Sequence, residues 1–141
     1  MASADELRQQ IADARNAFRQ ALQGVDGKWE QSPGGEEWSP KQIAQHAIGG
    51  EVYFANFVST AMLGKPGEAD RSEIASSADA LTRHEAAAAL ADRAFKYVED
   101  SDLTKPAENI PGSTDQNVEA AMRGAAAHLR EHTEQLRSFL G

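Results

Sequence analysis

The sequence predicts an all-α protein, an up-down four-helix bundle with a longer crossover between its second and third helices. Apolar residues recur every three or four positions in four separate segments, which is the periodicity of helices that bury one side. Stretches rich in glycine and proline separate these segments, and no useful length of alternating apolar and polar residues predicts a strand. The 141 residues suit one core, so we expect a single domain over residues 1–141.

The first predicted helix starts near Ser3 or Asp5 and stops before the stretch "GVDGKW". Its spacing of apolar residues is 4, 7, 4 and 3, which places them on one side of a helix. These residues are Leu7, Ile11, Phe18, Leu22 and Val25.

The second predicted helix has a well-marked start. Ser39 is placed to be its N-cap, Pro40 is the first helical residue, and Gln42 completes a capping box. The helix should end at residue 62 or 63, before "GKPGEADR". Gly49 and Gly50 lie inside it and each costs about 1 kcal/mol against alanine, so we expect them to permit a close approach by a helix, a partner subunit or a substrate.

The third and fourth helices are predicted at residues 80–100 and after the proline-containing stretch 101–114. The connector before the third helix, from about Gly64 to Ala78, is long enough to cross the end of the bundle. Ser113 or Thr114 is expected to cap the fourth helix. The predicted inward residues are Leu81, Ala88, Phe95 and Val98 on the third helix, and Val118, Ala121, Ala125, His128, His132, Gln135 and Phe139 on the fourth.

Composition and charge argue against several functional classes. The 22 acidic residues exceed the 14 basic ones, and the formal charge of −8 repels phosphate, so we expect no nucleic-acid partner. The sequence has no cysteine, which fits a reducing compartment and removes thiolate ligands. The polar start "MASADELRQQ" and the lack of a long apolar run predict a cytoplasmic protein with no membrane partner.

Three of the four histidines lie at positions that predict a shared metal site. His128 and His132 are four residues apart and therefore lie on one side of the fourth helix. His46 follows Ile43 by three residues on the second helix, so all three imidazoles are predicted to point into the bundle. Three neutral imidazoles from facing helices suit a divalent ion and leave one ligand position open.

The alternative interpretation treats these residues as hydrogen-bonded core histidines. Each buried donor or acceptor without a partner would cost about 1–3 kcal/mol, and a single ion would satisfy all three rings.

His84 is expected to be a surface histidine, because "TRHEAA" is typical of a solvated helix edge. Residues 128–132 also fit H-x-x-E-H, but Glu131 should turn about 100° away from His132 and face solvent.

Other polar and aromatic residues near these histidines are weaker candidates. Glu51, Tyr53 and Gln135 could each orient a ligand. We expect instead that Glu51 lies at the surface or just behind the ligands, and that Tyr53 is an aromatic residue at the edge of the core. Gln135 is expected to be a polar residue at the end of the inward side of the fourth helix. Trp38 and Trp29 are interpreted as hydrophobic plugs rather than as anchors at a pocket mouth.

The stretches "WSPKQIAQH" at 38–46 and "HLREHTEQL" at 128–136 resemble the DinB/YfiT-like family of metal-binding four-helix bundles. That family carries one histidine on the second helix and an H-x-x-x-H pair on the last. The resemblance implies one divalent metal ion, nickel or zinc, held by His46, His128 and His132, and a homodimer. It also implies a small-molecule thiol or electrophile as partner, because members of known chemistry use mycothiol or bacillithiol.

Two functions stay open from the sequence. The first is a metal-dependent transferase acting with a low-molecular-weight thiol, or a related hydrolase, since a divalent ion favours thiolate or hydroxide. The second is a non-catalytic dimeric bundle that binds a metal or ligand in a stress-related or sensor role. The sequence identifies no catalytic residue and no second general base.

Overall fold

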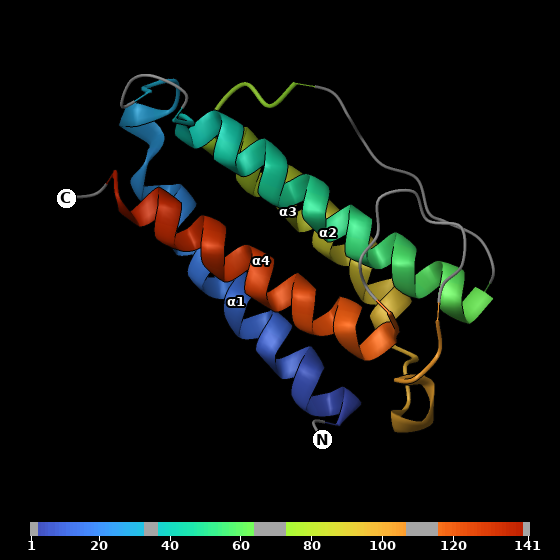
Figure 1. Ribbon diagram of the computed structural model, residues 1–141. Coiled ribbons are helices and arrows are strands. Elements are labelled where there is room, and N and C mark those ends of the chain that lie inside the picture. Colours follow the sequence, from blue (N-terminus) through green and yellow to red (C-terminus); the bar gives the residue numbers. More distant parts are fainter. Residues whose placement is uncertain (1–2, 33–36, 64–72, 107–115, 140–141) are drawn as a thin grey trace.

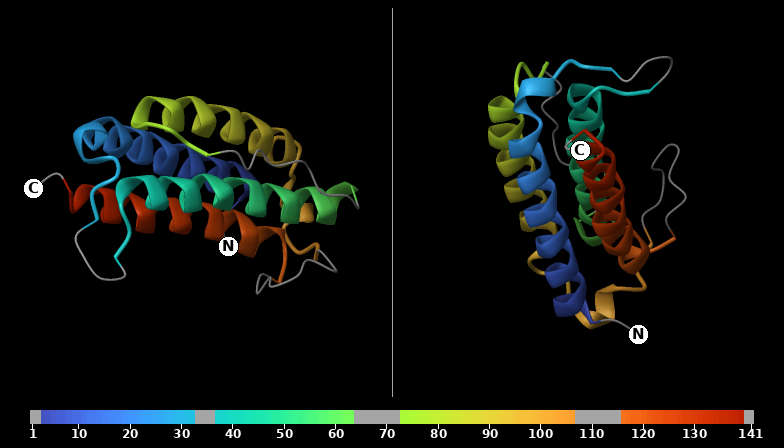
Figure 2. Two further views of the ribbon diagram at one scale, coloured as in Figure 1. Left: turned by 90° about the horizontal axis from the view of Figure 1, so that it is seen from above. Right: turned by 90° about the vertical axis from the view of Figure 1, so that its left-hand side faces the viewer.

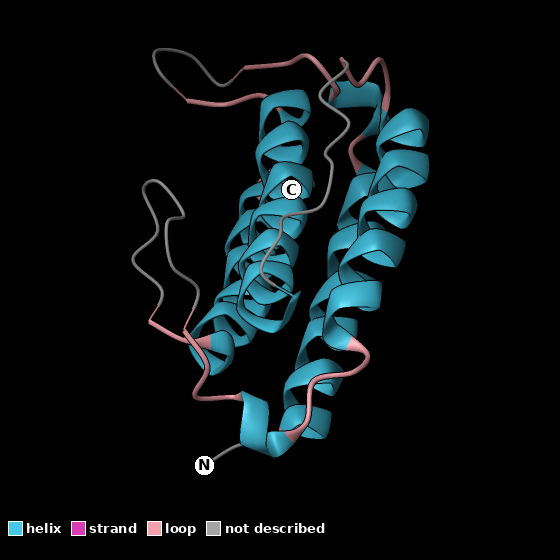
Figure 3. Cartoon of the chain, turned by 90° about the vertical axis from the view of Figure 1, so that its right-hand side faces the viewer, coloured by secondary structure: helices cyan, strands magenta, loops and turns pink. Residues whose placement is uncertain are grey.

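The computed structural model describes residues 3–32, 37–63, 73–106 and 116–139. Within these ranges the chain forms four α-helices: α1 (Ala4–Gly24), α2 (Pro40–Leu63), α3 (Ser77–Phe95) and α4 (Val118–Arg137). Two short 3₁₀ turns, Asp26–Lys28 and Asp100–Asp102, lie in the connections. The described residues contain no strand (Figure 3), so the predicted all-α fold is confirmed.

The helices pack as a bundle in which α1 lies against α4, α4 against α2, and α2 against α3 (Figures 1 and 2). Contacts at the ends of the helices fix their directions. Ser77, at the start of α3, donates a hydrogen bond of 2.5 Å to the carbonyl of Leu22 near the end of α1. Lys41, at the start of α2, pairs with Glu73 just before α3. Helices α2 and α3 therefore begin at the same end of the bundle and run parallel. Residues 64–72 of the predicted crossover lie outside the described ranges.

The starts of the first two helices agree with the predicted caps. The side chain of Ser3 accepts a hydrogen bond from the backbone N–H of Glu6 at 3.1 Å, which satisfies one of the free donors of the first turn. At α2, the side-chain oxygen of Gln42 accepts from the backbone N–H of Ser39 at 2.9 Å. These contacts fix the first residue of α2, and hence which side of the helix His46 occupies.

The predictions for the last two helices need correction. Helix α3 begins at Ser77 and ends at Phe95, instead of covering residues 80–100. Its buried side contains Ser77, Ala80, His84, Ala87, Ala91 and Phe95, so Leu81 and Ala88 are only partly buried. The alanine run "AAAA" fits several helical phases equally well, which explains the error. Helix α4 is capped by the side chain of Asn117, while the expected caps Ser113 and Thr114 lie outside the described residues.

The core occupies the space between all four helices. Its largest fully buried apolar side chains are Phe18, Phe57, Phe95, Leu7, Ile11, Leu22, Ile74, Leu103, Met122, Leu129 and Leu136. Trp29 is also buried, as expected of a hydrophobic plug. No helix among the described residues is both long and apolar enough to cross a bilayer.

Candidate metal centre

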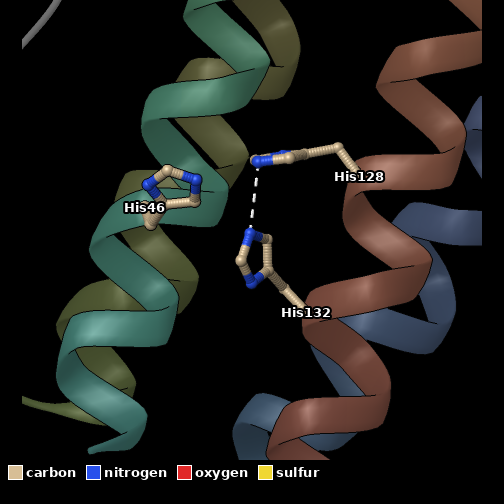
Figure 4. A group of neighbouring side chains, drawn as sticks. All are labelled: His46, His128 and His132. Atoms are coloured by element: carbon tan, nitrogen blue, oxygen red, sulfur yellow. Dashed lines mark hydrogen bonds between the residues drawn. The ribbon is translucent and has the colours of Figure 1, made fainter. Parts of the chain in front are cut away.

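The structure brings together three histidines from two helices that are far apart in the sequence. His46 projects from α2, and His128 and His132 project from the facing side of α4 (Figure 4). The centroids of the three rings are 4.4 to 5.0 Å apart. One ring nitrogen from each histidine lies within 4.8 Å of the other two, so the three-histidine cluster is able to bind a metal ion.

The cluster lies at the edge of the α2–α4 seam and not in the centre of the bundle. His132 is 3% exposed, His128 is half-buried and His46 is exposed. The prediction that all three rings point into the core is therefore wrong for His46. Its position is four residues before Gly50, on the side of α2 that borders solvent, so one side of the cluster is open to small molecules.

Hydrogen bonds fix which nitrogen of His132 is free. Its Nδ1 lies 2.6 Å from the side-chain oxygen of Gln135, and an amide oxygen only accepts, so Nδ1 carries the proton. The Nε2 lone pair then faces Nε2 of His128 at 3.1 Å. A tetrahedral ion with bonds of about 2.0–2.1 Å holds its ligand nitrogens about 3.3 Å apart. The His128–His132 pair fits that spacing.

Burial disfavours the charged form of two of the three histidines, His128 and His132. Burial, followed by the neighbouring rings of His132 and His46, lowers the pKa of His128 to about 4. Burial also lowers the pKa of His132, against the opposing effect of its hydrogen bond to Gln135. Neutral imidazoles have the lone pair that a metal ligand needs. No carboxylate belongs to the cluster within the described part of the chain.

A cleft of about 410 Å³ adjoins the cluster and runs along α2. Its lining is Gln45, His46, Gly49, Gly50, Tyr53, Phe54 and His128. A Cβ atom on Gly50 would lie 2.3 Å from Cε1 of His128, so this glycine permits the close approach that the sequence suggested. A Cβ on Gly49 would meet nothing within 4 Å.

Trp38 lies against the three-histidine cluster, which the sequence did not predict. Its side chain is 40% exposed, and the interpretation as a simple plug is wrong. The indole ring lies 5.1 Å from the ring of His46 and 6.3 Å from that of His132, nearly parallel to the latter at 15°. The seven residues between Trp38 and His46 include the start of α2, so this contact depends on how the chain turns into the helix and could not be derived from spacing alone.

The fourth histidine belongs to a separate buried network. His84 is fully buried, so its predicted surface position is wrong. Its Nε2 lies 2.9 Å from Oε2 of Glu51, and its ring packs edge-on against Phe18 at 4.9 Å. Residue 84 follows Ala80 by four and precedes Ala87 by three, which is the spacing of the buried side of α3.

Glu51 is also buried, and a surface position for it is ruled out. Arg15 binds it through two hydrogen bonds, Nε to Oε2 at 2.8 Å and Nη2 to Oε1 at 3.2 Å, and donates a third to Asp92 at 2.6 Å. Burial favours the neutral carboxyl, but the hydrogen bond from His84 and the charge of Arg15 outweigh it and hold the pKa of Glu51 below its ordinary value. Sequence reasoning missed Arg15, although it stands four residues after Ile11 on the apolar side of α1.

Of the remaining candidates, Tyr53 and Glu131 lie near their expected positions and Gln135 does not. Tyr53 is partly buried at the core edge and lines the cleft. Glu131 is exposed, as expected for a residue on the solvated side of α4. Gln135 was predicted to face inward along with the histidines of α4, but it is exposed, and its side chain contacts Nδ1 of His132.

Comparison with known families agrees with this architecture. The sequence matches the DinB superfamily over residues 3–136, a range that includes α1 to α3, α4 up to its penultimate residue, and the three histidines. No curated protein and no solved structure gives a significant match. The chain therefore belongs to the DinB superfamily.

Proposed function

We propose that His46, His128 and His132 bind one divalent transition-metal ion and that the protein transfers a low-molecular-weight thiol to an electrophile. The observation that carries the proposal is the convergence of three ring nitrogens within 4.8 Å. Neutral imidazoles suit zinc, nickel, copper and iron better than magnesium or calcium. The resemblance to DinB/YfiT-like proteins narrows the choice to nickel or zinc.

The ligand set supports a reactive site more than a structural one. Structural zinc sites in proteins have four protein ligands, whereas three ligands leave a position for water or substrate. The exposed edge at His46 gives access to that position. Because no carboxylate offsets the charge of the ion, it would favour an anionic ligand and lower the pKa of a bound thiol or water.

The lining of the cleft favours thiol transfer over hydrolysis. Apart from the histidines, its polar side chains are the amide of Gln45 and the phenol of Tyr53, and no carboxylate in the described lining could act as a general base. A thiol that loses its proton to solvent on binding needs no such base. Its sulfur would form a bond to an electrophilic carbon, and the leaving group would depart with the bonding electron pair.

The lack of an acid or base in the described lining also favours a second candidate, a non-catalytic bundle that binds a metal or small ligand. Turnover separates the two. The transferase should consume monochlorobimane in the presence of mycothiol or bacillithiol and one equivalent of nickel or zinc. The binder should show occupancy and thermal stabilisation without product.

Metal content of the untagged protein tests the ligand set. We expect one equivalent of nickel or zinc per chain after dialysis, and a large loss in both His46→Ala and His132→Ala. Gln45→Ala is a matched control, because Gln45 is exposed beside His46 and belongs to no ligand set. Equal metal content in all four proteins would contradict the proposal.

We also propose that the protein is a homodimer, as the resemblance implies. The exposed ring of Tyr97 and the neighbouring groove between α2 and α3 offer an apolar surface that would suit a second copy. Sedimentation velocity should give twice the mass of the chain, and Tyr97→Glu should shift the population toward monomer. A monomer at all concentrations would contradict this part of the proposal.

A further inference from the structure

Two adjacent glycines in the middle of α2 have different structural explanations. Each glycine in a helix interior disfavours folding by about a factor of five relative to alanine. For Gly50 the reason is steric, because any side chain would collide with the ring of His128. Packing does not explain the glycine at position 49, because a Cβ atom there would have no neighbouring atom within 4 Å.

The position of Gly49 on α2 gives a reason for a residue without a side chain. Gly49 follows His46 by three residues and precedes Tyr53 by four, so these residues share one side of α2. All three line the cleft of about 410 Å³ that begins at the histidine cluster. A side chain at position 49 would therefore project into the cleft between a proposed metal ligand and Tyr53.

The chemistry of the lining limits what the cleft can hold. Besides the histidines and glycines it contains Gln45, Tyr53 and Phe54, and its described lining includes no carboxylate, ammonium or guanidinium group. A carboxylate or ammonium on a ligand would lose water there without gaining a charged partner. Hydroxyl groups could bond to the amide and the phenol, and apolar or sugar-ring faces could pack on the aromatic rings.

We propose that Gly49 keeps this cleft open for the uncharged body of a small molecule whose anionic group binds at the histidine cluster. This inference rests on the proposed metal site and specifies which part of α2 selects the ligand. Gly49 is then a specificity-determining residue, and its lack of a side chain serves binding at the expense of helix stability.

The test uses Gly49→Ala and Gly49→Leu in the full chain, with three thiol probes. These are 2-mercaptoethanol, which is small, 1-thio-β-D-glucose, which has an uncharged body, and 1-thio-β-D-glucuronate, which has the same sugar ring with a carboxylate far from the sulfur. Cobalt(II) is the metal, because thiolate binding to it gives a visible charge-transfer band. The melting temperature of the metal-free protein is a second readout that requires no ligand.

We expect Gly49→Ala to melt about 3–5 °C higher than the wild type, because alanine favours the helix. Cobalt affinity should stay within twofold in both variants. Gly49→Leu should bind thioglucose at least tenfold more weakly and 2-mercaptoethanol within twofold of the wild type. Thioglucuronate should bind the wild type at least tenfold more weakly than thioglucose, because the described lining offers its carboxylate no charged partner.

Several results would overturn the inference. A lower melting temperature of Gly49→Ala would show that the glycine is needed for packing. Equal thioglucose affinity in Gly49→Leu and the wild type, with cobalt bound to both, would contradict the inference while leaving the metal site intact. A wild-type protein that takes up no cobalt would contradict the proposed function itself, and the role of Gly49 would fall with it.

Discussion

The ring of His84 and the rings of the three-histidine cluster lie in one bundle but face different partners. His84 is fully buried and contacts Glu51, which Arg15 binds from the other side. The cluster residues face one another, and their nearest outside partners are the amide of Gln135 and the indole of Trp38. The ring of His84 thus contacts a carboxylate, and the rings of the three-histidine cluster contact none within the described residues.

This difference separates a structural role from a binding role. In the buried network the charges of Arg15 and Glu51 compensate each other inside the protein, so no outside ion is needed. In the cluster the ring nitrogens converge on a common point at an accessible edge. We therefore propose different roles for His84 and for the three-histidine cluster, and substitutions should separate them.

The largest expected effect is on the buried network. Glu51→Ala leaves the guanidinium of Arg15 without its buried partner and should lower the free energy of unfolding by about 3–5 kcal/mol. Urea denaturation measures this loss. Asp92→Ala removes the exposed partner of Arg15 and should cost about 0–1 kcal/mol. Equal effects of the two substitutions would contradict the distinction.

A comparison of two histidine substitutions tests the distinction between the buried network and the three-histidine cluster further. His84→Ala creates a cavity in the core and should cost about 2–3 kcal/mol, the lower part of the usual range, because its Nδ1 already lacks a partner. His46→Ala changes an exposed side chain and should alter the stability of the metal-free protein by about 0.5 kcal/mol or less. If His46→Ala is the more destabilising substitution, our assignment of the two roles is reversed.

The contact between Gln135 and His132 should affect metal affinity but hardly stability. Gln135→Ala removes the acceptor that holds the Nδ1 proton of His132 and should weaken zinc binding by about 10–100-fold. Gln135→Glu keeps an acceptor at that position and should retain the affinity. Isothermal titration calorimetry measures both variants, and an unchanged affinity in Gln135→Ala would argue against this orienting role.

The smallest expected effect is a difference in pH dependence. Because the pKa of His128 is about 4 in the fold against an ordinary 6.5, the unfolded chain binds the proton first. The free energy of unfolding of the metal-free protein should therefore fall as the pH drops from about 6.5 to about 4. The loss should be modest, because the ring is half exposed to solvent and screened.

The carboxylate of Glu51 should act in a lower pH range. Its pKa is held below 4.5 in the fold, so the stability that it contributes is present above that pH and is lost as the pH falls through the lowered value. Urea midpoints between pH 3 and pH 7.5 measure both ranges. His128→Gln should flatten only the upper one, and an unchanged profile in this variant would contradict the assignment.

The sequence predicted those parts of the molecule that local patterns determine. Ser39 and Pro40 correctly predicted the start of α2, and the four-residue spacing correctly placed His128 beside His132. The exposure of His46 was not predicted. The convergence of the two helices followed from the bundle and from the family resemblance. The sequence of the third helix contains no such local pattern to indicate its buried side, because alanine is small enough to lie on either the buried or the exposed side of a helix.

The buried network could not be derived because it depends on contacts among three helices. Arg15 and Glu51 are both ordinary surface residue types, and only the packing of α1 against the neighbouring helices makes them partners. His84 was misplaced for the same reason, since its burial follows from the phase of α3. The position of Trp38 over the cluster likewise depends on the geometry of the chain before α2.

The measurement that tests the metal centre most directly is a crystal structure of the zinc-loaded protein, with anomalous diffraction recorded on both sides of the zinc edge. We predict a single strong peak between α2 and α4, at about 2.0–2.1 Å from Nε2 of His128, Nε2 of His132 and one ring nitrogen of His46. A map without a peak at this position, or with zinc bound only to surface carboxylates, would contradict the account.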